Sequence, residues 1–388
     1  MTPSARAQAA IELLDEIIAA TVSDGPPADA IIQRYFKTRR YAGSGDRRAV
    51  RELVFRAIRA VGERPTNGRA ALLALPDVAH LFDGSTRGPA LRGAEEQAAE
   101  TRLIPRWLQP ELSPLVGEDE WAALLDRAPL DLRVNVARTS REAMAAHLDG
   151  TEETPVSPWG LRLGADRTVS TEPAFADGLF EVQDEGSQLI ALACQAVDGM
   201  AVLDLCAGAG GKSLAIAAAA PGARIVATDT NRQRLAQLPP RASRAGAVIE
   251  SRLLDGGREA AQLAELDRLF DVVLVDAPCS GSGTWRRNPE GRWRLTPDRL
   301  QRLAALQARL LDLASPLVKP GGALVYATCS LLSVEGERQG ADFLGRHSDW
   351  RAQHVGFDGG RDSGPGRLLT PGHDATDGFY VARFVRPC

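Results

Sequence analysis

The second half of the chain alternates strand-like and helix-like segments, and this pattern limits the possible folds more than any other feature of the sequence. Five runs are rich in strand-forming apolar residues and end in polar ones: AVLDLC, ARIVATD, VIESRLLD, FDVVLVDAP and GALVYATCS. The segments between them repeat apolar residues at helical spacing. Apolar strands that alternate with helices are typical of a parallel sheet covered on both faces. We therefore predict an α/β fold with a doubly wound, Rossmann-like sheet.

Length and changes of pattern predict three domains. At 388 residues, the chain is longer than one typical domain. Residues 1–95 contain runs with helical periodicity and predict an all-helical domain, whose Gly- and Pro-containing end at 82–97 is typical of a linker. Residues 98–180 combine a helical run, EDEWAALLDRA, with a strand and a second helix, so we predict a small α+β domain. Residues 181–388 then form the α/β domain.

Several classes of protein do not fit this composition. No stretch approaches the roughly 18 apolar residues of a membrane span, and acids interrupt the apolar stripe near the N-terminus, unlike in a secretory signal. We therefore expect a cytoplasmic protein. The five cysteines are scattered without a CxxC pair, and the five histidines show no ligand spacing. We expect neither a disulfide framework nor a metal site, so individual thiols need another explanation.

The distribution of charge favours a nucleic-acid partner, although the formal net charge of −4 does not. Between Arg34 and Arg64, ten Lys or Arg residues stand against three Asp or Glu residues. A second run, TWRRNPEGRWR at 284–294, places arginines beside tryptophans, which suits phosphates and unstacked bases. A solvated helix face whose arginine stems cover apolar surface would have the same composition. Both interpretations stay open for each run.

Polar groups follow the strand-like runs at the edge where such sheets bind their ligands, because the carboxyl ends of parallel strands meet there. These groups are Asp204, Asp229, Asp255, Asp276 with Cys279, and Cys329. Packing alone does not require polar residues at five strand ends. We expect them to face one crevice.

The stretch LDLCAGAGGKS, residues 203–213, predicts a strand, a glycine-rich turn and the start of a helix. It is not a phosphate-binding P-loop, because the first glycine of GxxxxGK[ST] would fall on Cys206. It also lacks the third glycine of a dinucleotide fingerprint, where Ser213 stands. The turn therefore suits a different nucleotide-like cofactor.

Acidic residues after this turn favour S-adenosylmethionine over NAD. Asp229 follows Gly208 by 21 positions and can accept hydrogen bonds from both hydroxyls of a ribose. Asp255 would lie on the adenine side. A structural role stays open for each acid. Asp229 could merely cap the helix that begins at Asn231, and Asp255 could likewise have only a structural role.

Two cysteines at strand ends suit methylation of cytosine at C5. This carbon is too weak a nucleophile to take a methyl group from a sulfonium directly. A thiolate that adds to C6 raises the electron density at C5, so that methyl transfer follows. A base then removes the C5 proton and the thiol departs. A second polar group helps this release, and a carboxyl group near N3 stabilises the charge that develops during addition.

Five motifs follow one another from residue 180 onwards: FEVQDEGSQL, VLDLCAGAGGK, ATDTNRQRL, DVVLVDAPCSGSGTWRRNPEGRWR and LVYATCSLL. In this order they resemble the NOL1/NOP2/Sun family of RNA cytosine-C5 methyltransferases, in particular its bacterial Sun/RsmB-like members. The resemblance implies that Cys329 attacks C6 and that Cys279 assists release of the methylated RNA. It implies that Asp276 contacts the cytosine and that Lys212 belongs to the pocket. The S-adenosylmethionine would be bound by Cys206, Ala207, Gly208, Ala209, Gly210, Gly211, Lys212, Asp229, Asp255 and Asp276.

The N-terminal segments also carry resemblances. Residues 28–58 resemble the NusB-like helical domain of bacterial members that methylate small-subunit ribosomal RNA, although the helical region is shorter than a full NusB-like domain. Residues 98–180 are similar to the small RNA-recognition-like domain of the family. The implied partner is RNA, in particular 16S ribosomal RNA, and the implied state is a monomer. Three alternatives stay open: methylation of transfer RNA, a DNA cytosine methyltransferase that uses the Pro-Cys thiol, and a non-catalytic RNA-binding assembly factor.

Overall fold

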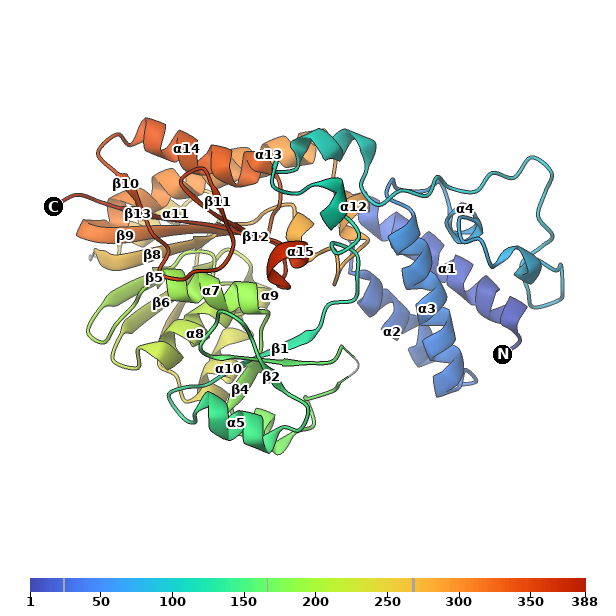
Figure 1. Cartoon of the computed structure of the whole chain (residues 1–388), viewed down its shortest axis with the longest axis horizontal. Coiled ribbons are helices and arrows are strands. Elements are labelled where there is room, and N and C mark those ends of the chain that lie inside the picture. The colour runs from blue at the N-terminus through green and yellow to red at the C-terminus, as the bar shows by residue number, and fades with distance from the viewer. Residues whose placement is uncertain (24, 166, 267–268) are drawn as a thin grey trace. The chain divides into compact units, whose positions relative to one another are not determined.

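The computed structural model describes residues 1–23, 25–165, 167–266 and 269–388, and it divides into two compact units whose elements are drawn in Figure 1. The helical unit consists of Met1–Leu112, Trp121–Asp126 and Thr284–Pro297. The sheet-containing unit consists of Ser113–Glu120, Arg127–Gly283 and Asp298–Cys388. Each unit is therefore built from several segments of the chain.

The helical unit contains α1 (Pro3–Val22), α2 (Ala28–Thr38), α3 (Ser44–Ala60), α4 (Gly68–Leu73) and α12 (Gly291–Arg294). Thr2 caps α1 by accepting a hydrogen bond from the N–H of Ala5 at 3.2 Å. Apolar residues at helical spacing, such as Leu14 on α1 and Val54 on α3, are completely buried in one core cluster. Residues 82–97 contain neither helix nor strand, but they lie within the helical unit, and Phe82 is buried in its core cluster.

The TWRRNPEGRWR run belongs to the interior of this helical unit. Trp293 is 2% exposed and lies in the core cluster. Arg292 is buried and donates to the carbonyl oxygen of Ile58 at 2.6 Å, while Arg294 donates to that of Ala20 at 3.2 Å. These carbonyls lie in the last turns of α3 and α1, where they have no helical donor. Both interpretations of the run, an RNA-binding surface and a solvated helix face, are wrong for the buried Arg292 and Trp293, whereas Arg294 is partly exposed.

A small antiparallel sheet precedes the α/β part of the sheet-containing unit. Its order is β2-β3-β1-β4, with β1 at Leu130–Val134, β2 at Glu152–Glu153, β3 at Gly160–Leu163 and β4 at Phe180–Val182, accompanied by α5 (Arg141–His147) and α6 (Pro173–Ala176). The helix predicted for EDEWAALLDRA is wrong, since only a 3-10 turn at Glu118–Glu120 and further turns form there. The chain changes unit at residues 120–121 and 126–127, so tertiary contacts override the local helical pattern.

The main sheet has the order β11-β12-β13-β9-β8-β5-β6-β7, with β10 paired to β13. Its strands are β5 (Ala201–Asp204), β6 (Arg224–Asp229), β7 (Ile249–Leu253), β8 (Phe270–Asp276), β9 (Val318–Thr328), β10 (Arg351–Gln353), β11 (Arg361–Ser363), β12 (Gly366–Leu369) and β13 (Phe379–Val385). The five predicted strands, β5 to β9, pair in parallel. The sheet is nevertheless mixed, because β13 runs antiparallel to β9, β10 and β12.

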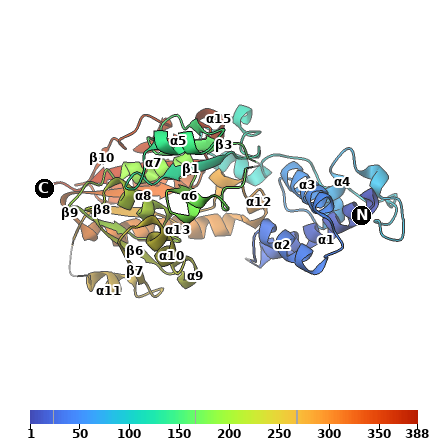
Figure 2. The same cartoon turned by 90° about the horizontal axis from the view of Figure 1, so that it is seen from below.

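Helices cover both faces of the main sheet, as Figures 1 and 2 show. One face carries α7 (Glu185–Ala193), α8 (Gly211–Ala219) and α10 (Leu238–Ala245), and the other carries α13 (Pro297–Ala314) and α14 (Glu337–Arg346). Shorter helices are α9 (Arg232–Leu235), α11 (Glu259–Ala264) and α15 (Pro371–Asp374). The predicted α/β fold class is confirmed. Within the described ranges, the protein has no helix that is both long and apolar enough to cross a membrane.

Candidate active site

The carboxyl ends of β5, β6, β8 and β9 meet at a cleft of about 500 Å³ in the sheet-containing unit. Five residues from the predicted site line it: Cys206, Asp229, Asp276, Cys279 and Cys329. Strand register explains their proximity. Asp276 at the end of β8 pairs with Ala327 of β9, two residues before Cys329.

The glycine-rich turn between β5 and α8 depends on left-handed backbone conformations. Gly208 has a φ of 55° and Gly210 a φ of 79°, which side chains rarely adopt. A Cβ atom on Gly210 would also lie 2.1 Å from Cδ1 of Leu238. The turn leads into the N-terminus of α8, whose first N–H groups lack helical acceptors. It can therefore bring backbone donors close to a ligand.

The two acids assigned to the cofactor differ in their surroundings. Asp229 is nearly buried, lines the cleft, and accepts hydrogen bonds from the N–H of Gly208 at 2.7 Å and of Asn231 at 2.6 Å. Asn231, not Asp229, caps the start of α9, and each carboxylate oxygen of Asp229 keeps a second lone pair for a ribose hydroxyl. Asp255 is exposed, accepts from Nε2 of Gln262 at 3.1 Å, and is not among the described residues that line the cleft.

Lys212 and Asp276 form an ion pair beside the thiols. Nζ of Lys212 lies 2.5 Å from Oδ2 of Asp276. Burial lowers the pKa of Lys212, whereas the charge of the adjacent Asp276 carboxylate and its hydrogen bond raise it. The raising effects are larger together, so the pKa of Lys212 is above its usual value. Lys212 therefore stays charged at neutral pH and holds Asp276 at the wall of the cleft.

The sulfur atoms of Cys279 and Cys329 lie 3.3 Å apart, and both side chains are partly exposed at the cleft. The hydrogen bond to Cys329, followed by burial, raises the pKa of Cys279 well above its usual value. Cys279 is consequently a neutral thiol near pH 7 that can donate its S–H to the sulfur of Cys329. A donor at this distance stabilises a neighbouring thiolate.

Cys206 and Asp204, both in the glycine motif, have pKa values that burial raises. Burial raises the pKa of Cys206, whose side chain lines the cleft. Burial also raises the pKa of Asp204 to about 7, and its Oδ2 accepts from the hydroxyl of Ser213 at 2.6 Å. Among the described residues, no group of three or more His, Cys, Asp or Glu side chains could hold a metal ion.

Comparison with known proteins identifies the family. Residues 190–385 match the family model described as 16S rRNA methyltransferase RsmB/F. The chain is 37% identical over 292 residues to the ribosomal RNA small subunit methyltransferase B of Erwinia tasmaniensis, a match that covers 73% of this chain and 66% of that protein. It is 34% identical over 331 residues to the protein of the same name from an Enterobacter species, covering 82% and 76%. The chain belongs to the RsmB/F family of 16S rRNA methyltransferases.

This RsmB/F chain spans about two thirds of the length of the first relative and about three quarters of the second. Its fold is shared by the crystal structure of PH0851, with a TM-score of 0.77 and 23% identity over 99% of each chain. NSun6 from Pyrococcus horikoshii matches with a TM-score of 0.65 and 19% identity over 73% of this chain and 98% of that one. The predicted family, one of S-adenosylmethionine-dependent RNA methyltransferases, is confirmed.

A buried carboxylate behind the two thiols was not singled out from the sequence of this RsmB/F protein. Glu335 is completely buried and accepts hydrogen bonds from the N–H of Ser280 at 2.9 Å, Nε2 of Gln307 at 2.9 Å and the hydroxyl of Ser330 at 2.6 Å. Ser280 follows Cys279, and Ser330 follows Cys329. One carboxylate therefore links both cysteine loops to each other and to α13. The only sequence signal was the acid-containing LLSVEGE stretch after the second cysteine.

Helix α13 supplies a wall of the RsmB/F cleft that sequence reasoning also missed. The residues of this helix that line the cleft are Arg299, Leu303, Leu306, Arg309, Leu310 and Leu313. Their spacing of three and four residues predicts one helix face, but it is the same spacing that a helix packed on a core would show. The cleft is thus lined by four leucines and two arginines of α13 as well as by polar strand ends.

Proposed function

We propose that this chain transfers the methyl group of S-adenosylmethionine to C5 of a cytosine in 16S ribosomal RNA, through a covalent bond between Cys329 and C6. The observation that supports it most is the pair of thiols 3.3 Å apart in a cleft that Cys206, Asp229 and Asp276 also line, with Lys212 paired to Asp276. A thiol pair with one member held neutral fits a nucleophile and an assistant.

The residues around the glycine turn suit S-adenosylmethionine. Gly208 and Gly210 give the turn its left-handed backbone conformations, and Cys206 at the start of the turn lines the cleft, so the turn lies beside the proposed cofactor site. Asp229 offers acceptors for the ribose hydroxyls, whereas the exposed Asp255 is a less direct candidate for the adenine side. When bound, S-adenosylmethionine supplies an electrophilic methyl group.

The roles of the reacting groups follow from their geometry. Cys329 as thiolate adds to C6, which raises electron density at C5 and lets that carbon take the methyl group. Asp276, held by Lys212, would contact the cytosine, and the ammonium of Lys212 beside it would offset the negative charge that develops in the ring when the thiolate adds. After a base removes the C5 proton, the bond between Cys329 and C6 breaks. The S–H of Cys279 would then hydrogen-bond to the departing sulfur.

The choice of RNA rests on the family description and on the names of the relatives. We propose that residues 1–95 act as a NusB-like RNA-binding domain and that residues 98–180 act as an RNA-recognition-like domain before the methyltransferase domain at 181–388. A monomer in the cytoplasm, where ribosomal RNA is made in bacteria, belongs to the same proposal.

Bisulfite sequencing of total RNA tests the function and its alternatives together. RNA from cells with the protein should retain one cytosine of 16S ribosomal RNA that is converted in cells lacking the gene, and Cys329→Ser should fail to restore its protection. Protection of a transfer RNA cytosine instead would contradict the proposed substrate. Unchanged RNA, together with no S-adenosylmethionine binding in calorimetry, would favour a non-catalytic assembly factor.

A further inference from the structure

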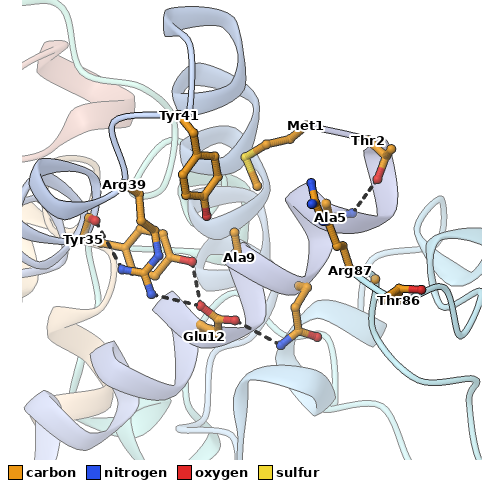
Figure 3. Close-up of a pocket in the computed structure, with 12 residues that line it drawn as sticks. Met1, Thr2, Ala5, Ala9, Glu12, Tyr35, Arg39, Tyr41, Thr86 and Arg87 are labelled. Carbon is orange, nitrogen blue, oxygen red and sulfur yellow. Dashed lines mark hydrogen bonds and ion pairs between the residues drawn. The ribbon is translucent and has the colours of Figure 1, made fainter.

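A groove of about 920 Å³ lies within the helical unit, and the proposed methyl transfer does not use it (Figure 3). Its walls are the first three turns of α1, residues at and after the end of α2, and the loop at 86–88. The groove is open and its lining is both aromatic and charged, so it is not a gap between packed helices.

Tyr41 provides an unusually exposed aromatic ring at this groove. Tyr41 is 74% exposed, whereas tyrosine is intermediate in burial among the residue types. Figure 3 shows the ring directed toward Ala9 and Glu12 of α1. An exposed, flat ring beside a groove is a stacking platform of the kind that proteins use for unpaired bases.

The floor of the groove is held in place by interactions among its own residues. The hydroxyl of Tyr35 donates to Glu12 at 2.7 Å, and Nη2 of Arg39 donates to the same carboxylate at 3.4 Å. The guanidinium carbon of Arg39 lies 3.5 Å from the centre of the Tyr35 ring. Because Glu12 is neutralised by Arg39, it does not leave an uncompensated negative charge in the groove.

The remaining charges at the groove are positive. Arg87 in the loop is exposed, and no hydrogen bond or ion pair of its side chain is found among the described residues. Arg40, which is not among the residues that line the groove, precedes Tyr41 in sequence and is exposed as well. One exposed cation in the groove and another next to the ring in sequence match a base with its flanking phosphates.

We propose that this groove binds a single-stranded segment of RNA, with one unpaired base stacked on Tyr41 and neighbouring phosphates paired with Arg87 and Arg40. The inference rests on the proposed function in taking the substrate as RNA. It adds a second RNA contact that captures the substrate without touching the reacting cytosine.

Fluorescence anisotropy of the full-length protein with a labelled oligouridylate tests this site. Tyr41→Ala should weaken binding roughly ten-fold, and Tyr41→Phe, which keeps the ring, should bind as the wild type does. Arg87→Gln should lower the slope of log K against log salt by about 0.7, the value for one phosphate contact on a single strand. Arg252→Gln, which removes an exposed arginine of the sheet-containing unit, controls for net charge.

Equal affinity of the wild type, Tyr41→Ala and Arg87→Gln would overturn the proposal, as would loss of binding in Tyr41→Phe equal to that in Tyr41→Ala. Methylation kinetics separate the groove from the chemistry. Tyr41→Ala should raise KM for ribosomal RNA and leave kcat unchanged. If the wild type binds oligouridylate through Tyr41 but methylates no RNA, the groove stands and the proposed function fails.

Discussion

Cys279 and Cys329 come from loops 50 residues apart in sequence, yet their sulfur atoms lie 3.3 Å apart and share a hydrogen bond. The N–H of Gly283 donates to the carbonyl oxygen of Cys329 at 3.0 Å, so the two loops are also joined through the main chain. The hydrogen bond to Cys329, followed by burial, raises the pKa of Cys279 well above its usual value.

Alkylation should reveal the difference between these thiols. Because the pKa of Cys279 is raised, its thiolate is scarce near pH 7 and iodoacetamide should modify it far more slowly than the exposed Cys388. In Cys329→Ala, the partner that raises this pKa is gone, so labelling of Cys279 should begin at lower pH. Mass spectrometry of peptides across a pH series measures both rates. Identical pH profiles of Cys279 in the two proteins would contradict the assignment.

Gly210→Ala should weaken S-adenosylmethionine binding more than the strain of an alanine at positive φ would by itself. The methyl group would meet Leu238 at 2.1 Å in addition to the cost of a φ of 79°. Gly150→Ala is a matched control, since Gly150 has a φ of 75° with no atom within 4 Å of its Cβ position. We expect Gly150→Ala to cost about 1 kcal/mol of stability and leave S-adenosylmethionine affinity unchanged. Calorimetry should show at least a roughly ten-fold loss of affinity only for Gly210→Ala.

Glu335→Ala should disturb both cysteine loops at once. It leaves the donors of Ser280, Gln307 and Ser330 buried without their acceptor, at about 1–3 kcal/mol for each donor that finds no other partner. Chemical unfolding should show a loss of at least about 2 kcal/mol, and single-turnover methylation should slow by roughly 100-fold.

Glu337→Ala is the control for this variant. Glu337 accepts hydrogen bonds from the hydroxyls of Ser333 and Ser363, and not from Ser280 or Ser330. Its loss should lower stability with little effect on the methylation rate. Equal rates for Glu335→Ala and the wild type would show that the carboxylate does not position the thiols.

Asp204 should make stability depend on pH. Burial raises the pKa of its carboxyl to about 7, from 3.8 in a solvated chain. Between these values the folded state keeps a proton that the unfolded state has lost, so the stability from Asp204 is complete below about pH 4 and falls as pH rises to 7. Asp204→Asn, whose amide oxygen can still accept from Ser213, should gain about 4 kcal/mol relative to the wild type between pH 4 and pH 8. Urea unfolding of both proteins at pH 4 and pH 8 measures this gain. If the difference in free energy of unfolding between the variant and the wild type were the same at both pH values, the raised pKa of Asp204 would be contradicted.

The arrangement of the parallel strands was predictable because each strand combines a continuous apolar run with a polar end. Asp229, Asp276 and Cys329 were expected at one edge for that reason, and they line one cleft. The antiparallel strands β10 to β13 were not predicted. Three of them are only three or four residues long, and Gly366 and Arg361 interrupt the alternation that identifies a strand.

Tertiary context decided the features that sequence reasoning missed or misassigned. Arg292 and Trp293 have the composition of an RNA-binding run. In the structure, however, Arg292 donates a hydrogen bond to a carbonyl oxygen at the end of α3, and Trp293 packs in the apolar core. Glu335 looks like any surface acid until its three donors are located, because they come from segments far apart in sequence. Local pattern cannot distinguish such residues from exposed ones.

The covalent RNA adduct tests the central claim most directly. Cys279→Ala, Cys329→Ala and the double variant are each incubated with S-adenosylmethionine and 16S ribosomal RNA, then separated on a denaturing gel. Cys279→Ala should accumulate a protein–RNA adduct that cannot release, while Cys329→Ala and the double variant should form none. An adduct in Cys329→Ala that is absent from Cys279→Ala would assign the attack on C6 to the other thiol and contradict the mechanism.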